Sequence, residues 1–574
     1  MTTIGYPYTL PTTANMSFHE FVVPVSNDTQ YQRPLSDATA FRGRLRTALK
    51  EHKHSDRHDF LNIQKALEDY IPLLFGVVAG IENTELRLTN EVETVWRCTM
   101  SSVSLSSKQP RVKHKSIHYE AIFTLLTLGY VLMDRANEYS HTVQKKILVA
   151  IGDISSYAGG YGDGSSMVGS HIHHSGIAGG SGSGIGGGAG SGLGSGSGSG
   201  GGASSGGSHG VGAATSRLFK KGTSSTPSPF KSTKNTNTIG EFTDYLNDGD
   251  LAAIDHQLTQ AADLYCKAAG VFEYVVQSII PRWNKSLVAD FMQDTTGDVG
   301  STSGTLDLGK TSSSLSSVTA ANAKKVLSES SRPVDVQSAV VSAHIKLALA
   351  EAHACTVRKA SIKATRASAN KTSAPTFSKS GAGVSVAGAG ISKTSYVLLA
   401  KLTIGVKEEY ERAYGLLKSV KDLNEIASEF RAHVKDAKLY YEALAQTFLG
   451  MDAYEAQQYG KAIGFMSVAR ATFLSLTKSS KAHTIAQAAS FEYRLANEKV
   501  VAFQKINDSV TFEQVPTQTQ LLGVMPSGRD LLSPKKYIAP RPCFGSAATA
   551  TEGAHGGAGD SINKLSYAMQ GAYF

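Results

Sequence analysis

The stretch "SYVLLAKLTIGVKEEYERAYGLLK", residues 395–418, decides the fold class of this chain. Leu398 lies on the flank of its main apolar stripe, whereas Val397 and Ile404 point almost the opposite way at 100° per residue. A helix with apolar side chains on more than one side is expected to pack against more than one neighbour. The main stripe consists of Leu399, Leu402, Val406, Tyr410, Ala413 and Leu417.

Apolar residues recur at helical spacing through most of the chain outside its Gly- and Ser-rich tracts. One of these patterns, 250–280, is expected to stop at Pro281, and another is expected to start after Pro333. A short extended stretch is expected at 92–100, but no alternating strand pattern of any length occurs. The chain is therefore predicted to be all-α. The other predicted helices cover 59–80, 119–139, 334–360, 435–450 and 453–476.

The helices at 435–450 and 453–476 form a predicted helical hairpin. Ala443 and Gly450 on the first, with Gly460 and Ala462 on the second, are small enough to let two helices approach closely. Hairpins of this kind stack in tetratricopeptide repeats, where an inner helix contacts its own partner and the preceding hairpin. We therefore predict a helical solenoid, which would bury the several apolar sides of residues 395–418.

Three tracts dilute the hydrophobic content of the 574 residues to 41%. A Gly/Ser tract such as "GGSGSGIGGGAGSGLGSGSGSGGG" buries too little apolar surface to offset its ordering entropy. Disordered insertions are accordingly predicted at about 159–240, 292–331 and 361–392. They interrupt a single predicted domain, 1–543, which a short Gly/Ala-rich tail, 544–574, follows.

The net charge and the cysteines indicate which partners and which cellular compartment to expect. The formal net charge of +9 favours acidic peptides, anionic lipid surfaces or nucleic acid as partners, without choosing among them. Four widely spaced cysteines without a CxxC pair indicate a reducing, cytosolic protein. No signal peptide is recognised at the N-terminus, and "IFTLLTLGYVLM", 122–133, is too short to span a bilayer.

No catalytic or metal-binding constellation stands out. The histidines of "SHIHH", His171, His173 and His174, fall within the coil and lack a fixed frame, so a metal site is not expected. Cys98 has no local signature of a nucleophile. His344, His353 and Cys355 do not share a helix face and are expected to be packing residues. We therefore expect a protein that is not an enzyme and has no cofactor.

Four segments carry a family resemblance: "YPYTLPTTANMSF" near the start, "EVETVWRCTMSS" (91–102), "YGKAIGFM" (459–466) and "MPSGRDLLSPKKYIAPRP" (525–542). In their order and spacing the chain resembles the Alix-type Bro domain family, and within it members that act in fungal ambient-pH signalling. The resemblance covers most of the chain outside the three insertions. It implies a curved, mostly helical fold with a tetratricopeptide-like middle. The coiled arm and Pro-rich tail of Alix-like members are missing.

The resemblance also implies a binding site. Bro domains receive the C-terminal amphipathic helix of the filament-forming ESCRT-III subunit in an apolar patch, which is a helix-in-groove interaction. The family pattern places Leu398 and Leu402 at its two aliphatic positions and Thr356 at its aromatic position, with Val357 as a possible substitute. Leu398 and Leu402 could equally be packed inside the fold, as most helix leucines are.

By this resemblance, the function would be that of a non-catalytic adaptor in alkaline-pH signalling. It would bind ESCRT-III and promote proteolytic activation of a PacC-type transcription factor, with a calpain-like protease and a receptor–arrestin complex as further partners. It would be cytoplasmic, bind no nucleic acid, and reach plasma-membrane or endosomal sites through its partners. The alternatives are an endosomal-sorting adaptor that recruits a deubiquitinase, an enzyme with Cys98 as nucleophile, and a tetratricopeptide co-chaperone.

Overall fold

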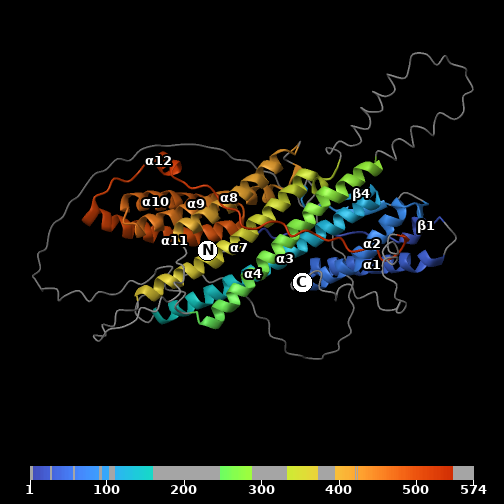
Figure 1. Cartoon of the computed structure of the whole chain (residues 1–574), viewed down its shortest axis with the longest axis horizontal. Helices are drawn as coiled ribbons and strands as arrows, with labels where there is room; N and C mark the ends of the chain where they lie inside the picture. Colours follow the sequence, from blue (N-terminus) through green and yellow to red (C-terminus); the bar gives the residue numbers. More distant parts are fainter. Residues whose placement is uncertain are drawn as a thin grey trace, which may run out of the picture. The chain divides into compact units, whose positions relative to one another are not determined.

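The prediction of a mostly helical fold is confirmed by the computed structural model (Figure 1). Within its described residues, short strands form two two-stranded antiparallel sheets in the N-terminal part. The predicted insertions 159–240 and 292–331, and residues 373–392 of the third, lie outside the described residues. The structure describes residues 4–25, 29–55, 58–89, 93–102, 110–158, 246–287, 332–372, 395–420, 422 and 425–546.

One buried carboxylate, that of Glu120, links several elements of the N-terminal part by hydrogen bonds. Its oxygens accept hydrogen bonds from Arg42 Nε (2.8 Å), Tyr70 Oη (3.1 Å) and Trp96 Nε1 (2.7 Å). A buried charge is tolerated only when it is paired and hydrogen-bonded in this way. The network joins α1 (Gln32–His54), α2 (Phe60–Glu82), β3 (Glu93–Arg97) and α3 (Ile117–Ala158), while β3 pairs with β4 (Arg111–Lys115) and β1 (Val22–Pro24) pairs with β2 (Leu86–Leu88).

The rest of the described chain is a series of helices in which each packs against the next. At Gly450 a Cβ atom would lie 3.1 Å from Met466 Cε and 3.3 Å from the Ala462 carbonyl oxygen, so small residues do let this hairpin close. The predicted hairpin is thus present, although its turn falls at 456–458. The series is α4 (Asp248–Tyr274), α7 (Ser338–Thr372), α8 (Tyr396–Lys418), α9 (Ser428–Glu455), α10 (Tyr459–Ser479) and α11 (His483–Ile506).

Helix α8 is surrounded, which explains its several apolar sides. It packs against both α7 and α9. Tyr410 stacks on Tyr441 of α9, with ring centroids 5.6 Å apart. Ile404 is buried on the side that carries Glu411, whose carboxylate pairs with Lys438 of α9 at 2.7 Å.

Pro281 does not end its helix, contrary to the sequence prediction. The helical backbone continues over 280–287. A π turn, Val275–Ile279, ends two residues before the proline. Because proline lacks an N–H and its ring crowds the carbonyl four residues back, the wider π turn gives it room to stay in a helix.

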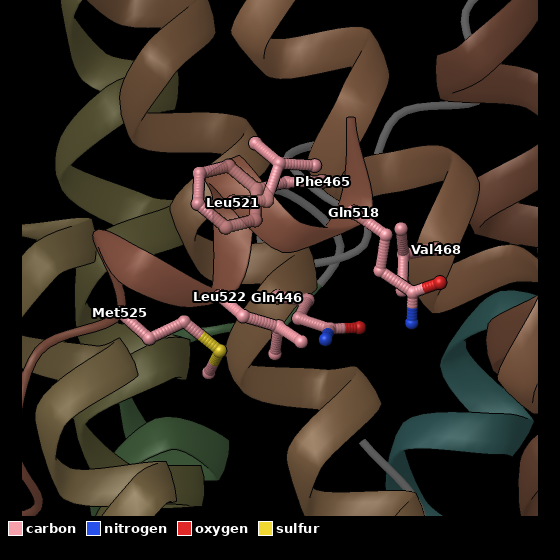
Figure 2. Close-up of a pocket in the computed structure, with 7 residues that line it drawn as sticks. All are labelled: Gln446, Phe465, Val468, Gln518, Leu521, Leu522 and Met525. Carbon is pink, nitrogen blue, oxygen red and sulfur yellow. The ribbon is translucent and has the colours of Figure 1, made fainter. Parts of the chain in front are cut away.

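After α11 the chain returns across the helices it has built. A short helix, α12 (Gln518–Gly523), starts with a Thr517–Gln520 capping box and buries Leu521. Figure 2 shows side chains of this segment facing α9 and α10: Leu521, Leu522 and Met525 lie near Gln446, Phe465 and Val468. Residues 524–546, here called the strap, then run in extended, irregular backbone from this anchor as far as α2 (red in Figure 1).

Two expected boundaries differ from the structure. Helix α7 continues to Thr372, so residues 361–372 are helical although they were expected in the third insertion. Phe544, expected in the tail, is buried, and its ring occupies the space next to Gly76 of α2. The packed chain therefore extends to Ser546, whose N–H donates to Glu85 Oε1 at 3.1 Å. None of the described helices combines the length and the hydrophobicity needed to cross a membrane.

Candidate binding groove

The strap lies directly on the outer face of α8. The Arg529 N–H donates to the Lys401 carbonyl at 3.0 Å, and the Gly528 N–H donates to Glu408 Oε1 at 3.1 Å. Gly405 makes this approach possible, because a Cβ atom there would lie 2.6 Å from the Arg529 carbonyl oxygen. A third side of α8, besides those that face α7 and α9, is thus covered by the strap.

On α7 the strap is held by one imidazole ring. Nε2 of His353 accepts the N–H groups of both Leu531 and Leu532, each at 2.9 Å. A ring nitrogen that accepts two hydrogen bonds carries no proton, so His353 is neutral here. Burial lowers the pKa of His353, in agreement with that geometry.

Charged groups gather on one side of this crossing. Arg412 of α8 reaches Asp530 of the strap at 3.3 Å and also pairs with Glu409. Lys346 of α7 lies 3.7 Å from Glu409 Oε2. Burial raises the pKa of Glu409, and the two cations offset only part of that rise. These pairs tie α7, α8 and the strap together.

The residues predicted from the family pattern lie on the other side of the crossing. Lys346 of α7 pairs with Glu409, whereas the strap that is bonded to His353, seven residues further along α7, crosses α8 at Lys401, so the two helices run antiparallel. Because each step forward on α7 is a step back on α8, Thr356 lies at about the level of Leu402.

Only two of the three predicted residues are accessible. Leu398 and Thr356 are both partly exposed. Leu402 is 5% exposed and belongs to the core, so it does not offer its side chain to a partner. Val357 is fully buried and cannot substitute for Thr356. Helix α8 is rotated so that Leu398, and not Leu402, carries its accessible face.

A cleft lies between α7 and α4, and its lining on α7 begins at Lys359. Its volume is about 620 Å³. Lys359 and Lys363 follow Thr356 at three and seven residues, on the same face of α7. The lining combines apolar and charged side chains: Asp248, Leu251, Ala252, Ile254, Asp255, His256, Leu258, Thr259, Lys359, Ile362 and Lys363.

One carboxylate organises the polar part of this cleft. Asp255 of α4 pairs with Lys359 at 2.7 Å and with Lys363 at 3.0 Å. Lys359 also donates to Thr259 at 2.9 Å. Burial acts to raise the pKa of Asp255, but the two lysines outweigh it and lower that pKa. The cleft is thus lined by apolar side chains and by one carboxylate that is paired with two lysines.

The other candidates from the sequence take up structural positions. Burial, with Asp335 nearby, raises the pKa of Cys98 far above its usual range, which disfavours the thiolate that a nucleophile needs. His344 lies between two hydroxyl groups, those of Tyr8 (3.4 Å) and Tyr130 (3.3 Å). The described residues contain no cluster of His, Cys, Asp or Glu that could hold a metal ion. The predicted His171, His173 and His174 cluster lies outside the described residues.

Sequence reasoning missed the strap and the role of His353. The segment "MPSGRDLLSPKKYIAPRP" has no helical or alternating period, so its packing left no apolar pattern. The signal that could have found it is the pair of helix-interior glycines Gly405 and Gly270. At both positions a Cβ atom would meet the strap backbone.

Residues 250–528, which contain α4, α7, α8, the groove and the first strap residues, match the model of the BRO1-like domain family. This part of the chain is a BRO1-like domain. Helices α7 to α11, Thr356 and Leu398 therefore lie within the BRO1-like match, as does α4 from Asp250 onward, while the part of the strap beyond Gly528 lies outside it.

Curated relatives of this BRO1-like protein match it in part. The pH-response regulator protein palC of Emericella nidulans is 32% identical over 154 residues, which are 23% of this chain and 30% of that protein. The palC protein of Cryptococcus neoformans is 32% identical over 139 residues, 24% of this chain and 27% of that protein. The matched part thus spans about a third of the length of these relatives.

Solved structures with a similar arrangement include an ALIX BRO1 CHMP4C complex. It is 12% identical, with a TM-score of 0.47, and the match covers 94% of this chain and 97% of that chain. A structure described as the basis for endosomal targeting by the Bro1 domain is also 12% identical. Its TM-score is 0.45, with 93% of each chain covered.

Proposed function

We propose that this BRO1-like protein is a non-catalytic adaptor that binds the C-terminal amphipathic helix of an ESCRT-III filament subunit in the groove at Thr356 and Leu398. The partial similarity to palC proteins supports a role of this adaptor in ambient-pH signalling. There it would promote proteolytic activation of a PacC-type transcription factor by a calpain-like protease. Its recruitment to plasma-membrane or endosomal sites would come through ESCRT-III and a receptor–arrestin complex.

The observation that carries the proposal is the groove itself. Thr356 and Leu398 are partly exposed on adjacent helices, and a cleft lined by apolar and charged side chains begins at Lys359, three residues after Thr356. An amphipathic helix laid there would bury its apolar face between α7, α8 and the strap. Burying one leucine contributes about 1.5–3 kcal/mol, so a few such contacts give a micromolar-class interaction.

The test is binding of the purified chain to a fluorescently labelled C-terminal helix of the main ESCRT-III subunit. Leu398→Asp is expected to weaken binding about tenfold or more, because the charge replaces a leucine contact worth at least about 1.4 kcal/mol. Circular dichroism should show unchanged helicity, since Leu398 is only partly buried. In cells, the same variant is expected to reduce processing of the PacC-type factor after a shift to alkaline medium.

Leu61→Asp is the matched control, because Leu61 is 63% exposed on α2, far along the chain from the groove. It should bind as the wild type does. Leu402→Asp is expected instead to lower the unfolding temperature, since it buries a charge in the core. Equal binding by the Leu398→Asp and Leu61→Asp variants would contradict the proposed site, and a wild type that does not bind would contradict the proposed function.

A further inference from the structure

The antiparallel pair β3–β4 has one face toward the core and one exposed, cationic face. Along β4 the exposed residues Arg111, Lys113 and Lys115 alternate with two half-buried residues, one of which is His114. The His114 ring stacks on Tyr119 of α3, with centroids 5.0 Å apart, so its side of the pair faces the core. Because alternate side chains of a strand point to opposite faces, the three cations share the outer face.

Strand β3 adds a further cation to this outer face. Directly opposite residues of an antiparallel pair point to the same side. The register pairs Arg97 with Arg111, and it pairs Glu93 with Lys115. Among the residues of these two strands, which the structure describes in full, Glu93 is the one carboxylate, and it contacts Lys113 at 3.1 Å. Positive charge therefore exceeds negative charge on this face, and the cations follow one another along β4.

The two arginines that face each other are costly for the fold. The Arg97 N–H donates to the Thr12 carbonyl at 2.9 Å, so the backbone of Arg97 faces away from β4. Arg97 and Arg111 are thus a non-hydrogen-bonded pair, the kind in which opposed side chains come closest. Like charges placed directly opposite each other are destabilising. An anion bound between them would relieve that repulsion.

Protection against aggregation does not account for this arrangement. Cations on an edge strand can keep other strands away, which would explain those of β4. It does not explain Arg97, because β3 lies inside, between β4 and the N-terminal segment: the Ala14 N–H donates to the Val95 carbonyl at 3.1 Å. A local arrangement that costs stability without a packing gain points to a functional face.

The outer edge of β4 also offers backbone groups to a further strand. The Cys98 N–H donates to the Pro110 carbonyl at 2.9 Å, so Pro110 and every second residue after it turn their backbone toward β3. The N–H and C=O groups of Arg111 and Lys113 accordingly point away from β3. Within the described residues no other strand pairs with β4. This edge is therefore open to strand addition.

We propose that β4 is the docking edge for an extended, acidic segment of a partner protein. The segment adds as a strand, with main-chain hydrogen bonds to Arg111 and Lys113 and with acidic side chains at every second position. Side chains on one face of a strand recur about every 6.8 Å, so these carboxylates match the cations in spacing. The surface is separate from the groove at Thr356 and Leu398 and does not depend on the function proposed for that groove.

A peptide strand fits this edge better than a membrane surface does. None of the large hydrophobic side chains that are exposed in the described part of the chain lies on β3 or β4. Val95, the apolar residue of the outer face, is only partly exposed. Anchoring in a bilayer needs an apolar contact, whereas strand addition needs the unpaired backbone groups that β4 has.

The experiment measures binding of the full chain to a short, fluorescently labelled peptide that alternates Glu and Thr. Lys113→Glu is expected to weaken binding about tenfold, because repulsion replaces attraction. Lys505→Glu is the matched control, since it makes the same change in net charge at an exposed lysine of α11, and it should bind as the wild type does. Arg97→Gln should weaken binding severalfold and yet raise the unfolding temperature, because it removes the like-charge pair; a purely structural arginine would not raise it.

Hydrogen exchange shows whether the bound peptide forms a strand. The peptide should slow exchange at the amides of Arg111 and Lys113, and the same peptide methylated at every second amide, those that face β4, should not bind. Bound peptide that leaves these two amides unprotected would overturn the proposal. So would equal affinity for a peptide that alternates Gln and Thr, equal binding by the Lys113→Glu and Lys505→Glu variants, or no binding of the acidic peptide. Tighter binding of phosphatidylserine vesicles or of a single-stranded oligonucleotide than of the acidic peptide would overturn it in favour of a lipid or nucleic-acid surface.

Discussion

At the scale of a single residue, the hold on the strap depends on the protonation of His353. Its Nε2 atom faces two N–H donors, so a proton on that atom would replace an acceptor with a third donor. Burial lowers the pKa of this ring. Asp530 and the Leu349 carbonyl act to raise that pKa, and Arg412 acts to lower it. Glu409 and Lys346 face the same crossing and are paired with each other.

Acid should therefore loosen the strap at α7. Because the pKa of His353 in the folded chain is below its ordinary value of 6.5, the stabilisation is present above that pH and is lost as the pH falls through the lowered value. We expect the amides of Leu531 and Leu532 to lose protection from hydrogen exchange as the pH is lowered from 8 to 5.

His353→Gln is the variant that isolates this effect. The glutamine amide oxygen can accept N–H bonds but does not titrate, so protection of the two strap amides should become independent of pH. Exchange rates are compared after correction for their intrinsic pH dependence. Identical pH profiles for the wild type and His353→Gln would show that the ring does not control the strap.

At the scale of an element, the strap needs space as well as hydrogen bonds. Gly405 leaves room for the Arg529 carbonyl, and a methyl group at that position would press on backbone rather than on a flexible side-chain end. Gly415, nearly three turns further along the same helix, has nothing within 4 Å of a Cβ atom. Gly415 is therefore the matched control for Gly405, because both lie in α8 and only Gly405 packs against the strap.

We expect Gly405→Ala to lower the free energy of unfolding by about 1–3 kcal/mol, because the strap must move away or be strained. Gly415→Ala should raise it by about 0.5–1 kcal/mol, since alanine is the better helix residue where space is free. Chemical denaturation followed by circular dichroism measures both. A Gly405→Ala variant as stable as Gly415→Ala would mean that the strap is not held tightly on α8.

The limits of sequence reasoning also belong to the scale of elements. Helix α8 was predictable because its apolar residues recur at helical spacing, and so was the α9–α10 hairpin from its small residues. The strap was not, because an extended segment bonded to helix carbonyls and to one histidine carries no period. The accessible groove residue also depends on the rotation of α8, which is set by α7, α9 and the strap together. A pattern in one helix therefore could not separate Leu398 from Leu402.

At the scale of the whole folded part, the N-terminal segment joins elements far apart in the sequence. The Tyr6 ring meets Phe430 and His433 of α9, with centroids 5.0 and 5.2 Å away. Tyr8 stacks on Tyr130 of α3 at 4.9 Å, and its backbone N–H donates to Asp134 at 3.1 Å. This segment therefore packs against both α3 and α9, next to their buried titratable side chains Asp134 and His433.

Those buried groups have opposite pH dependences. Burial raises the pKa of Asp134 to about 8, and it lowers the pKa of His344 and of His433 to about 3. The raised carboxyl stabilises the fold at low pH, and its contribution is lost as the pH rises through about 8. The depressed histidines stabilise it above about 6.5, and their contribution is lost as the pH falls. Two histidines outweigh one carboxyl below pH 6.5, so stability should be greatest near that pH.

Asp134→Asn should remove the alkaline part of this dependence. The asparagine oxygen can still accept the Tyr8 N–H, but no proton is released between pH 6.5 and 9. For the wild type, one proton corresponds to a loss of at most about 1.4 kcal/mol per pH unit over that interval. Thermal unfolding measured from pH 5 to 9 should show a falling alkaline limb for the wild type and a flatter one for the variant. Below pH 6.5 the variant should lose stability more steeply than the wild type, because the carboxyl no longer offsets one of the two histidines. An equally steep alkaline limb in both proteins would assign the effect to other buried carboxyls, such as Glu351 of α7, whose pKa is also raised by burial. A flat limb in Asp134→Asn alone would show that alkaline pH destabilises the fold by ionising Asp134, the residue that holds the N-terminal segment on α3.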